Sequence, residues 1–588
     1  MKVKCFGSLF RASVFSFISI VAIVCQAPVV LAAETDTATK KSIIKKVEFS
    51  GSLGFDQNFF SYESNDSTFV ASRPRSQTIL MASASISYGR FSLPFSFSYV
   101  VAEKTPEFVT PIPNKFSLQD LLNNYNTISV NPTFKNLQIN LGTHVPQYSE
   151  LTSGDLPLFG TGFYWKPKKL RIGAFYGISQ RGINTDTLNA VPGSYQRMSG
   201  GIKLGFGSEE GSHIYAVVLN HKDDPNSALV TTQGIYSQEN LVSSLDMRLK
   251  LSKKLFLQTE IAGSLLSTDR NDPSLESDSF ELNLPNWFKD AFTLRTSSSV
   301  GAATSAAFGY TGEKWGFKTS GKFYSSDYRT LNFPFLQTDR LEWLVEPYFT
   351  IFKGHVSLNG SIGRWVDNLL RNKNATAYQT IGSLNANIKL SSNLTLSGSY
   401  SNFGMRNTVA NDTFRLQNIN ENISISTSYN ISKDKAVHAF LLAFNRSSFD
   451  DLNLLSGVFA DNTTEVYLFS YSLSLANKPL SITLSDSYMQ NELYLGDLKL
   501  NTATAGINYQ FGKEKNLNTG ILGNYLSTFL DENSPDQSFS LSFIASQTLW
   551  KKLNLSFNGT YNLFSYGSNR PGITYNENSI RIAANYSF

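Results

Sequence analysis

The side chains best suited to proton transfer at neutral pH are the five histidines of this 588-residue chain. They lie at His144, His213, His221, His355 and His438. None belongs to a His-Glu-x-x-His motif or to a Cys/His cluster, the compact ligand sets of many zinc sites. We also find no Gly-x-Ser-x-Gly elbow and no phosphate-binding glycine loop in a suitable context. The sequence therefore predicts no catalytic residue, no metal ligand and no cofactor.

One loop does bring a histidine, a serine and an aspartate close together. His144, Ser149 and Asp155 all lie in the stretch THVPQYSELTSGDLPLFG. A nucleophile and its base must meet at hydrogen-bond distance, which a five-residue spacing across Pro146 does not ensure. A solvated loop after a strand is the simpler interpretation, so we do not expect an enzyme.

Cysteine and charge content exclude further classes of protein. Cys5 and Cys25 are the only cysteines, and both lie in the N-terminal segment, so no thiol chemistry is expected after it. The 51 basic and 46 acidic residues nearly balance, which argues against nucleic acid as a partner. Charged residues make up 16% of the chain and aromatic residues 13%. This composition is typical of a transmembrane β-barrel with one lipid-facing and one polar surface.

Residues 1–32 have the features of a secretory signal peptide. The basic region, the apolar run and the cleavage site fall at Lys2, Lys4, Arg11, Val14–Val24, Ala32 and Ala33. The apolar run is short for a helix that must span about 30 Å of hydrocarbon. We expect export, cleavage and a short segment at 33–44, with a membrane anchor and lipidation at Cys25 as the alternatives.

The last ten residues, SIRIAANYSF, alternate between an apolar and a mostly polar face, as an extended strand does. The same alternation recurs at Leu480–Tyr488 and Leu553–Leu563. This tail resembles Gram-negative outer-membrane β-barrel proteins, whose final strand typically ends in phenylalanine. The resemblance implies contact with outer-membrane lipid and insertion by the barrel-assembly machinery. Tyr586 and Phe588 would then form the C-terminal insertion signal.

Short turns alternate along the chain with longer polar loops. Gly89-Arg90 and Lys353-Gly354 are examples of the turns, and Glu63–Pro74 and Gln490–Asp497 of the loops. This asymmetry predicts an all-β fold, a single large antiparallel transmembrane barrel over 45–588, with about 26 strands (about 22–28). Both termini would lie on the periplasmic side. A soluble β-sandwich or propeller is the alternative.

Alternation also predicts which charges face the lumen, since a charge facing lipid at mid-depth costs about 2–4 kcal/mol. The predicted inward charges are Arg171, Lys203, Asp246, Arg248, Lys250, Glu260, Lys318, Lys322, Glu342, Glu346, Lys389, Glu577 and Arg581. Both signs are present. They favour a wet lumen crossed by ion pairs over a strongly selective pore.

A barrel of this size usually has its lumen occupied. Residues 33–44 are too few for the separate plug domain of the TonB-dependent transporters. The two longest loops, Glu103–Asn124 and Thr268–Asp290, are predicted either to fold inward as constrictions or to cap the outside. The sequence favours a channel for passive or facilitated passage of polar solutes. The alternative is a non-conducting scaffold in a secretion or surface-attachment assembly, with a protein partner or a loop in the lumen.

Overall fold

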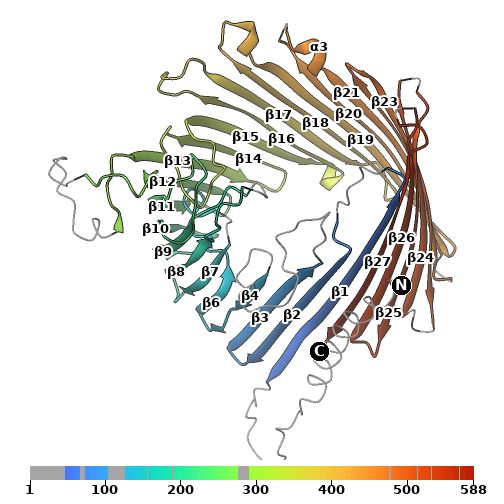
Figure 1. The fold of residues 1–588 in the computed structure, drawn as a ribbon, viewed down its shortest axis with the longest axis horizontal. Coiled ribbons are helices and arrows are strands. Elements are labelled where there is room, and N and C mark those ends of the chain that lie inside the picture. Colours follow the sequence, from blue (N-terminus) through green and yellow to red (C-terminus); the bar gives the residue numbers. More distant parts are fainter. Residues whose placement is uncertain are drawn as a thin grey trace, which may run out of the picture.

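The computed structural model describes residues 47–66, 73–103, 126–154, 157–187, 191–275 and 291–588, except 454, 476, 477, 513, 515, 532 and 569. The predicted signal peptide and segment 33–44 lie outside these residues. A single antiparallel sheet of 27 strands closes on itself where β1 (Glu48–Ser64) pairs with β27 (Thr574–Ser587). Figure 1 shows this sheet as a ring. Closure leaves no open edge, which is what lipid surroundings demand of a backbone. The prediction of a closed all-β barrel is confirmed.

The other strands follow one another around the barrel in chain order. They are β2 (Ser76–Tyr88), β3 (Phe91–Ala102), β4 (Thr127–Val130), β5 (Thr133–Phe134), β6 (Leu137–His144), β7 (Leu158–Trp165), β8 (Leu170–Gln180), β9 (Gln196–Gly207), β10 (His213–Asp224), β11 (Glu239–Lys250), β12 (Leu255–Ser267), β13 (Ser298–Thr311), β14 (Trp315–Tyr324), β15 (Arg340–Ile351), β16 (Val356–Asp367), β17 (Ala377–Lys389), β18 (Leu394–Asn407), β19 (Gln417–Lys433), β20 (Ala436–Asp451), β21 (Asn462–Leu475), β22 (Leu480–Leu493), β23 (Gly496–Phe511), β24 (Leu517–Leu530), β25 (Asp536–Leu549) and β26 (Leu553–Ser565). Short helical turns lie at η3 (Phe352–Gly354), η4 (Asp412–Phe414) and α3 (Gly457–Ala460). No described helix is long and apolar enough to cross a membrane.

Two of the 27 strands are parts of one spanning strand. Both β4 and β5 pair with β3 on one side and with β6 on the other. Asn131 and Pro132 separate them, because proline has no N–H group to donate to a ladder. The N–H of Asn131 still donates to the carbonyl of Pro94 at 2.9 Å, which keeps the neighbouring strands together. The barrel thus has 26 spanning strands, the predicted number.

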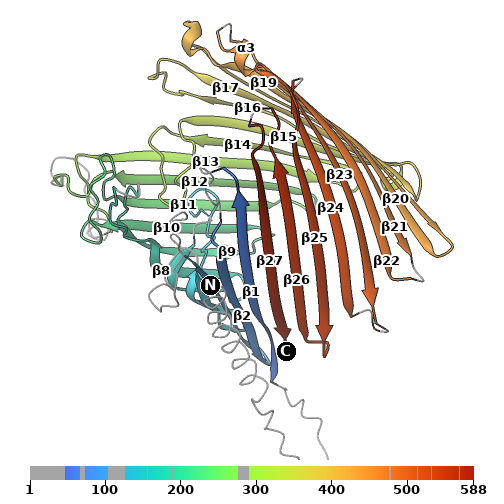
Figure 2. The same cartoon turned by 45° about the vertical axis from the view of Figure 1, so that its right-hand side comes forward.

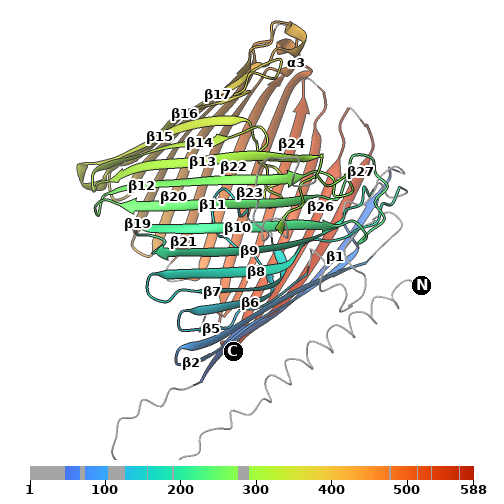
Figure 3. The same ribbon diagram turned by 90° about the vertical axis from the view of Figure 1, so that its left-hand side faces the viewer.

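Turns and loops fall on opposite ends of the strands, as predicted. The turn at Gly89-Arg90 joins β2 to β3, and the turn at Lys353-Gly354 joins β15 to β16. Figure 2 shows β22–β27 side by side and Figure 3 shows β7–β14 as the near wall. One predicted loop is wrong: Gln490–Asp497 reduces to Tyr494 and Leu495, because β22 and β23 continue pairing to Leu493 and Gly496.

The outer face of the strands is apolar. On β9, Ile202, Leu204 and Phe206 are exposed, whereas Lys203 between them is buried on the inner side. Trp165 and Trp315 are also exposed beside the turn ends of their strands, where amphipathic aromatic side chains favour the level of lipid headgroups. The outer face therefore has the surface that a bilayer requires.

The C-terminal residue takes part in closing the barrel. The N–H of Gly51 donates to the carbonyl of Phe588 at 3.1 Å, and the N–H of Phe588 donates back at 3.0 Å. The Phe588 ring stacks on Phe49 with centroids 4.6 Å apart. A Cβ at position 51 would lie 2.3 Å from the carbonyl oxygen of Ser83. Glycine at 51 is therefore what lets the strands meet here.

Candidate lumen site

The inner surface of the barrel divides into two sectors. The covered sector, β8–β14, runs from teal to green in Figure 1, and the exposed sector, β16–β27, runs from yellow to red. Apolar inner side chains of the covered sector with at most 1% exposure include Tyr215, Val217, Leu219, Val242 and Ala303. Inner side chains of the exposed sector include the exposed Ser357, Asn359 and Asn385. Two loops that fold into the lumen account for this difference.

Inner loop 1 (residues 145–154) follows β6 and lies on the inner face of β9–β14. Lys203 donates from Nζ to the carbonyl of Tyr148 at 2.8 Å. Glu260 Oε2 accepts the N–H groups of Glu150 and Leu151 at 3.2 and 3.3 Å. The Glu150 carboxylate in turn lies 2.6 Å from the ammonium of Lys322. Side chains from three different strands therefore hold this loop inside the barrel.

Inner loop 2 (residues 325–339) joins β14 to β15 and packs against inner loop 1. Tyr328 donates from its hydroxyl to the carbonyl of Leu151 at 2.8 Å. Thr330 donates in the same way to the carbonyl of Thr152 at 3.1 Å. A Cβ at Gly301 would lie 2.2 Å from the Tyr328 nitrogen. Inner loop 2 therefore approaches the wall so closely that only glycine fits there.

An apolar core lies between the two loops and the wall. Leu151 and Tyr328 pack with Val242 and Ala303 on the inner faces of β11 and β13. Burial raises the pKa of the Tyr328 hydroxyl and, together with Tyr164, that of Tyr148. Both hydroxyls therefore stay neutral. The contact between the loops and the wall buries apolar surface, as the core of a soluble domain does.

Three of the predicted inward charges form the base under these loops. Lys203, Asp246 and Glu260 are 6%, 9% and 2% exposed. The Lys203 ammonium lies 4.4 Å from the ring centroid of Tyr215, and Asp246 lies 3.2 Å from His213. Burial of an unpartnered charge is costly. Backbone groups of inner loop 1 supply partners to Lys203 and Glu260, whereas Asp246 has His213 of β10 as its partner.

The other predicted inward charges on β14 and β15 form ion pairs along the wall. Lys318 lies 3.6 Å from Glu346, and Glu342 lies 2.5 Å from Arg340. Lys322 is the exception, since its partner Glu150 comes from inner loop 1. The wall is therefore lined by both signs of charge at this point.

The remaining predicted charges lie further round the barrel. Arg171 donates to the carbonyls of Lys168 and Leu170 at 2.9 Å each, and Arg248 covers the Phe256 ring at 4.7 Å. Arg581 of β27 forms an ion pair with Asp56 of β1 across the closing seam. Lys250 and Lys389 are exposed where β11 and β17 end, and Glu577 is half-buried on β27.

The possible catalytic group of the sequence does not assemble among the described residues. His144 Nδ1 lies 3.0 Å from the carbonyl of Gly142, whereas the Ser149 hydroxyl bonds to that of Thr152. Asp155 lies outside the described residues. Ser149 therefore shapes inner loop 1. The described part of the chain also holds no group of three side chains arranged to bind a metal ion.

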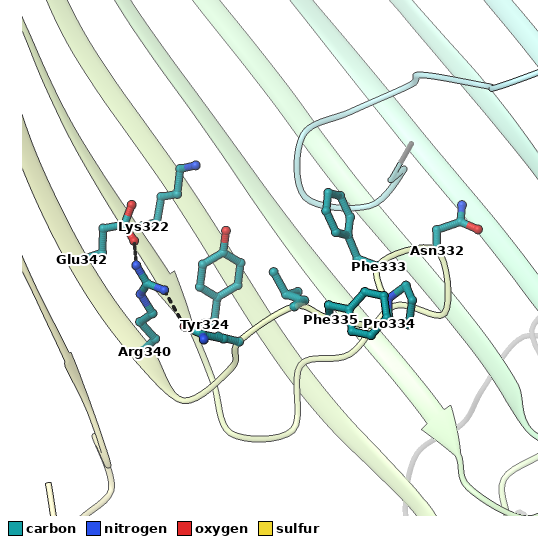
Figure 4. A pocket seen from close by; sticks show the side chains of 10 residues that line it. Lys322, Tyr324, Asn332, Phe333, Pro334, Phe335, Arg340 and Glu342 are labelled. Atoms are coloured by element: carbon teal, nitrogen blue, oxygen red, sulfur yellow. Dashed lines mark hydrogen bonds and ion pairs between the residues drawn. The ribbon is translucent and has the colours of Figure 1, made fainter. Parts of the chain in front are cut away.

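A pocket of about 510 Å³ lies between residues 332–337 of inner loop 2 and the wall. Figure 4 shows Phe333, Pro334 and Phe335 on the loop, and Lys322, Tyr324, Arg340 and Glu342 on or beside the strands. Phe335 is 93% exposed and Phe333 is 36% exposed. The pocket therefore offers aromatic rings on one side and paired charges on the other.

The two loops that the sequence analysis considered as constrictions are not inner loops 1 and 2. Residues 104–125 and 276–290 of the two longest loops lie outside the described residues. Among the described residues, the loops inside the barrel are inner loop 1 (145–154) and inner loop 2 (325–339). A usable signal was present, since LNFPFLQ (331–337) is far more apolar than an ordinary surface loop.

Several solved structures are similar to this chain at low identity. OpdQ of Pseudomonas aeruginosa is 11% identical with a TM-score of 0.33, over 64% of this chain and 97% of that one. The P pilus usher PapC translocation pore is 10% identical with a TM-score of 0.39, over 92% of this chain and 100% of that one. The ferric enterobactin receptor PfeA is 11% identical with a TM-score of 0.41, over 92% of this chain and 82% of that one. No protein-family model and no curated protein matches the sequence. These similarities indicate no specific family.

Proposed function

We propose that the protein is an outer-membrane channel for small polar solutes, narrowed from one side by inner loops 1 and 2. The observation that carries this proposal is the contrast between the two sectors. The exposed sector presents hydroxyl and amide side chains to the lumen, while the covered sector holds two anchored loops. A barrel in lipid needs a polar inner face only if that face meets water, loops or a partner.

The wall of the exposed sector suits uncharged, hydrogen-bonding solutes. A shallow cavity of about 310 Å³ on β16–β19 is lined by Ser357, Asn359, Asn385, Ala386, Asn387, Ser397, Gly398, Ser399, Ser424 and Ser426. Asn387 and Ser397 hydrogen-bond to each other at 2.9 Å. Hydroxyls and amides both donate and accept hydrogen bonds, so this surface can replace part of the water around a solute without a charge of its own.

Single-channel conductance in planar bilayers tests the proposal. We expect the wild-type protein to conduct. Replacing Phe333, Pro334 and Phe335 by glycine should raise its conductance, because these residues extend from inner loop 2 into the lumen. The matched control replaces Leu455, Val458 and Phe459 by glycine. These are equally bulky exposed residues at and beside α3, and their loss should leave conductance unchanged.

One result would contradict conduction, and another would contradict narrowing by inner loop 2. If wild type and both variants are electrically silent, and a second protein is recovered with the barrel in fixed proportion, the barrel is a scaffold. If both variants conduct equally, inner loop 2 does not narrow the path.

A further inference from the structure

A pair of arginines points outward from the barrel, away from the lumen. Arg364 lies on β16 and Arg406 on β18, and Tyr378 lies on β17 between them. The register pairs Arg364 with Trp343 and Arg406 with Tyr378. Trp343 is 48% exposed on the outer face, and Ile362, two residues from Arg364, is 57% exposed. We call Trp343, Arg364, Tyr378 and Arg406 the outer arginine patch.

Both guanidinium groups lie over the same aromatic ring. The Cζ atom of Arg364 is 4.5 Å from the Tyr378 centroid, and that of Arg406 is 5.6 Å away. The two positive charges therefore lie no further apart than the sum of these distances. One ring attracts each cation weakly, by about 0.5–1 kcal/mol at an exposed site, and it cannot neutralise two.

The described part of the chain offers these two guanidinium groups no carboxylate within ion-pair distance. Arg446, which also points outward from its strand, differs in this respect because it pairs with Glu465 at 3.9 Å. Two like charges held together without a counter-charge repel each other. An anion bound from outside the protein would remove this repulsion.

The patch also lies at the right depth for a lipid headgroup. Arg364 is three residues from the loop-side end of β16, and Arg406 is one residue from that end of β18. Tryptophan and tyrosine favour this level of a bilayer, and arginine binds phosphate with two parallel hydrogen bonds. We propose that the outer arginine patch binds the phosphate of an anionic lipid headgroup in the loop-side leaflet. The inference rests on the proposed membrane location but not on conduction.

The test measures lipid binding to the full-length protein in detergent micelles by native mass spectrometry. Dioleoyl phosphatidic acid, which carries a phosphomonoester, is the probe, and dioleoyl phosphatidylcholine is the reference lipid. A basic residue near an anionic lipid contributes about 1 kcal/mol, or roughly fivefold in affinity. We expect R364Q/R406Q to bind phosphatidic acid about 30-fold more weakly than wild type.

Matched variants separate this site from general attraction. R446Q removes an outward arginine that already has a partner and should change affinity by less than about twofold. R364K/R406K keeps both charges but loses the forked geometry, so its affinity should lie between wild type and R364Q/R406Q. Inorganic phosphate should not displace the lipid, which shows that the headgroup binds as part of a lipid.

Three outcomes would overturn the proposal: equal binding of the two lipids by wild type, equal losses in R364Q/R406Q and R446Q, or displacement by inorganic phosphate. Heat-modifiable migration on gels verifies that each variant is folded. Conductance is an independent measurement, since R364Q/R406Q changes only the outer surface. A failed lipid test and a failed channel test are therefore distinguishable.

Discussion

At the scale of single residues, Glu260 and Glu346 show how a loop packed over a carboxylate changes its burial and its hydrogen-bond partners. Both lie on the inner face of the barrel, where alternation predicts them. Glu260 is buried and accepts two N–H groups of inner loop 1, whereas the Glu346 side chain is 40% exposed beside Lys318. The alternation in sequence is identical for the two residues. Only the fold decides which of them becomes an anchor.

The first prediction concerns this anchor. Glu260→Ala leaves the N–H groups of Glu150 and Leu151 without their acceptor, and each unsatisfied buried group costs about 1–3 kcal/mol. We expect the free energy of unfolding to fall by about 2 kcal/mol or more, measured by urea titration in detergent micelles. Glu346→Ala is the control and should cost less than about 1 kcal/mol. Equal losses would show that inner loop 1 does not depend on Glu260.

Asp339, the last residue of inner loop 2, ties that loop to the next connection on the rim. Its carboxylate accepts the N–H groups of Asn368 and Leu369 at 3.1 and 3.0 Å and lies 2.5 Å from the ammonium of Lys373. Burial alone would raise the pKa of Asp339, but the bonds from Lys373, Leu369 and Asn368 outweigh it and hold the pKa below its usual value.

This shift predicts how the rim responds to acid. A carboxyl with a lowered folded pKa stabilises the fold above its unfolded pKa of about 3.9, and the stabilisation is lost as pH falls through the folded pKa. We expect residues 368–376 to be protected from proteolysis at pH 6 and to open below about pH 4. Asp339→Asn should make proteolysis of this connection independent of pH in that range. The same pH profile in both proteins would exclude Asp339 as the cause.

At the scale of elements, local chemistry fixes the strands and turns but not the inner loops. Strand alternation and turn residues are local signals, because each is defined by residues only a few positions apart in the sequence. Turn positions such as Gly89 (φ 62°) and Asp434 (φ 55°) could therefore be recognised from sequence. The break between β4 and β5 at Pro132 follows from the missing N–H group. The proline is visible in the sequence, but this break was not predicted from it. Docking of inner loops 1 and 2 depends on wall residues far away in sequence, which no local pattern encodes.

The two faces of β25 provide a test of the register. Leu541 is 44% exposed on the outer face near mid-strand, and Ser540 next to it faces the lumen. Leu541→Arg should destabilise the barrel by about 2–4 kcal/mol, because its charge meets lipid, while Ser540→Arg should be tolerated. Refolding titrations in lipid vesicles measure both. The reverse ranking would mean that the faces are exchanged, as a one-residue slip would do.

At the scale of the whole molecule, the barrel depends on a seam between its two ends. The register joins β1 to β27 from Ser52 and Ser587 to Ser64 and Tyr575. Arg581 and Asp56 add an ion pair across that seam, and Phe588 adds the stack on Phe49. The last residue therefore contributes to closure whatever its part in membrane insertion.

Two single substitutions separate these roles of Phe588. Phe588→Ala and Phe49→Ala each remove the same stacked pair, worth about 0.5–1.5 kcal/mol beyond the buried area. If Phe588 acts only through closure, heat-modifiable migration should suffer equally in both variants. We expect a larger loss of membrane-inserted protein in Phe588→Ala, because Phe49→Ala leaves the predicted terminal signal intact. Equal insertion in cells would reject that signal.

The hydrogen bond from Tyr328 to Leu151 joins residues 177 positions apart, and this distance sets an order of events in time. Contacts between remote residues form late, since the chain between them must first be fixed. We therefore expect inner loop 1 to reach its final place only after β9–β14 and inner loop 2 have formed beside it. On this expectation, Lys203 and Glu260 face water during assembly and lose that water when the loops dock. In the channel that we propose, the late step that removes water from these two charges is also the step that narrows the lumen.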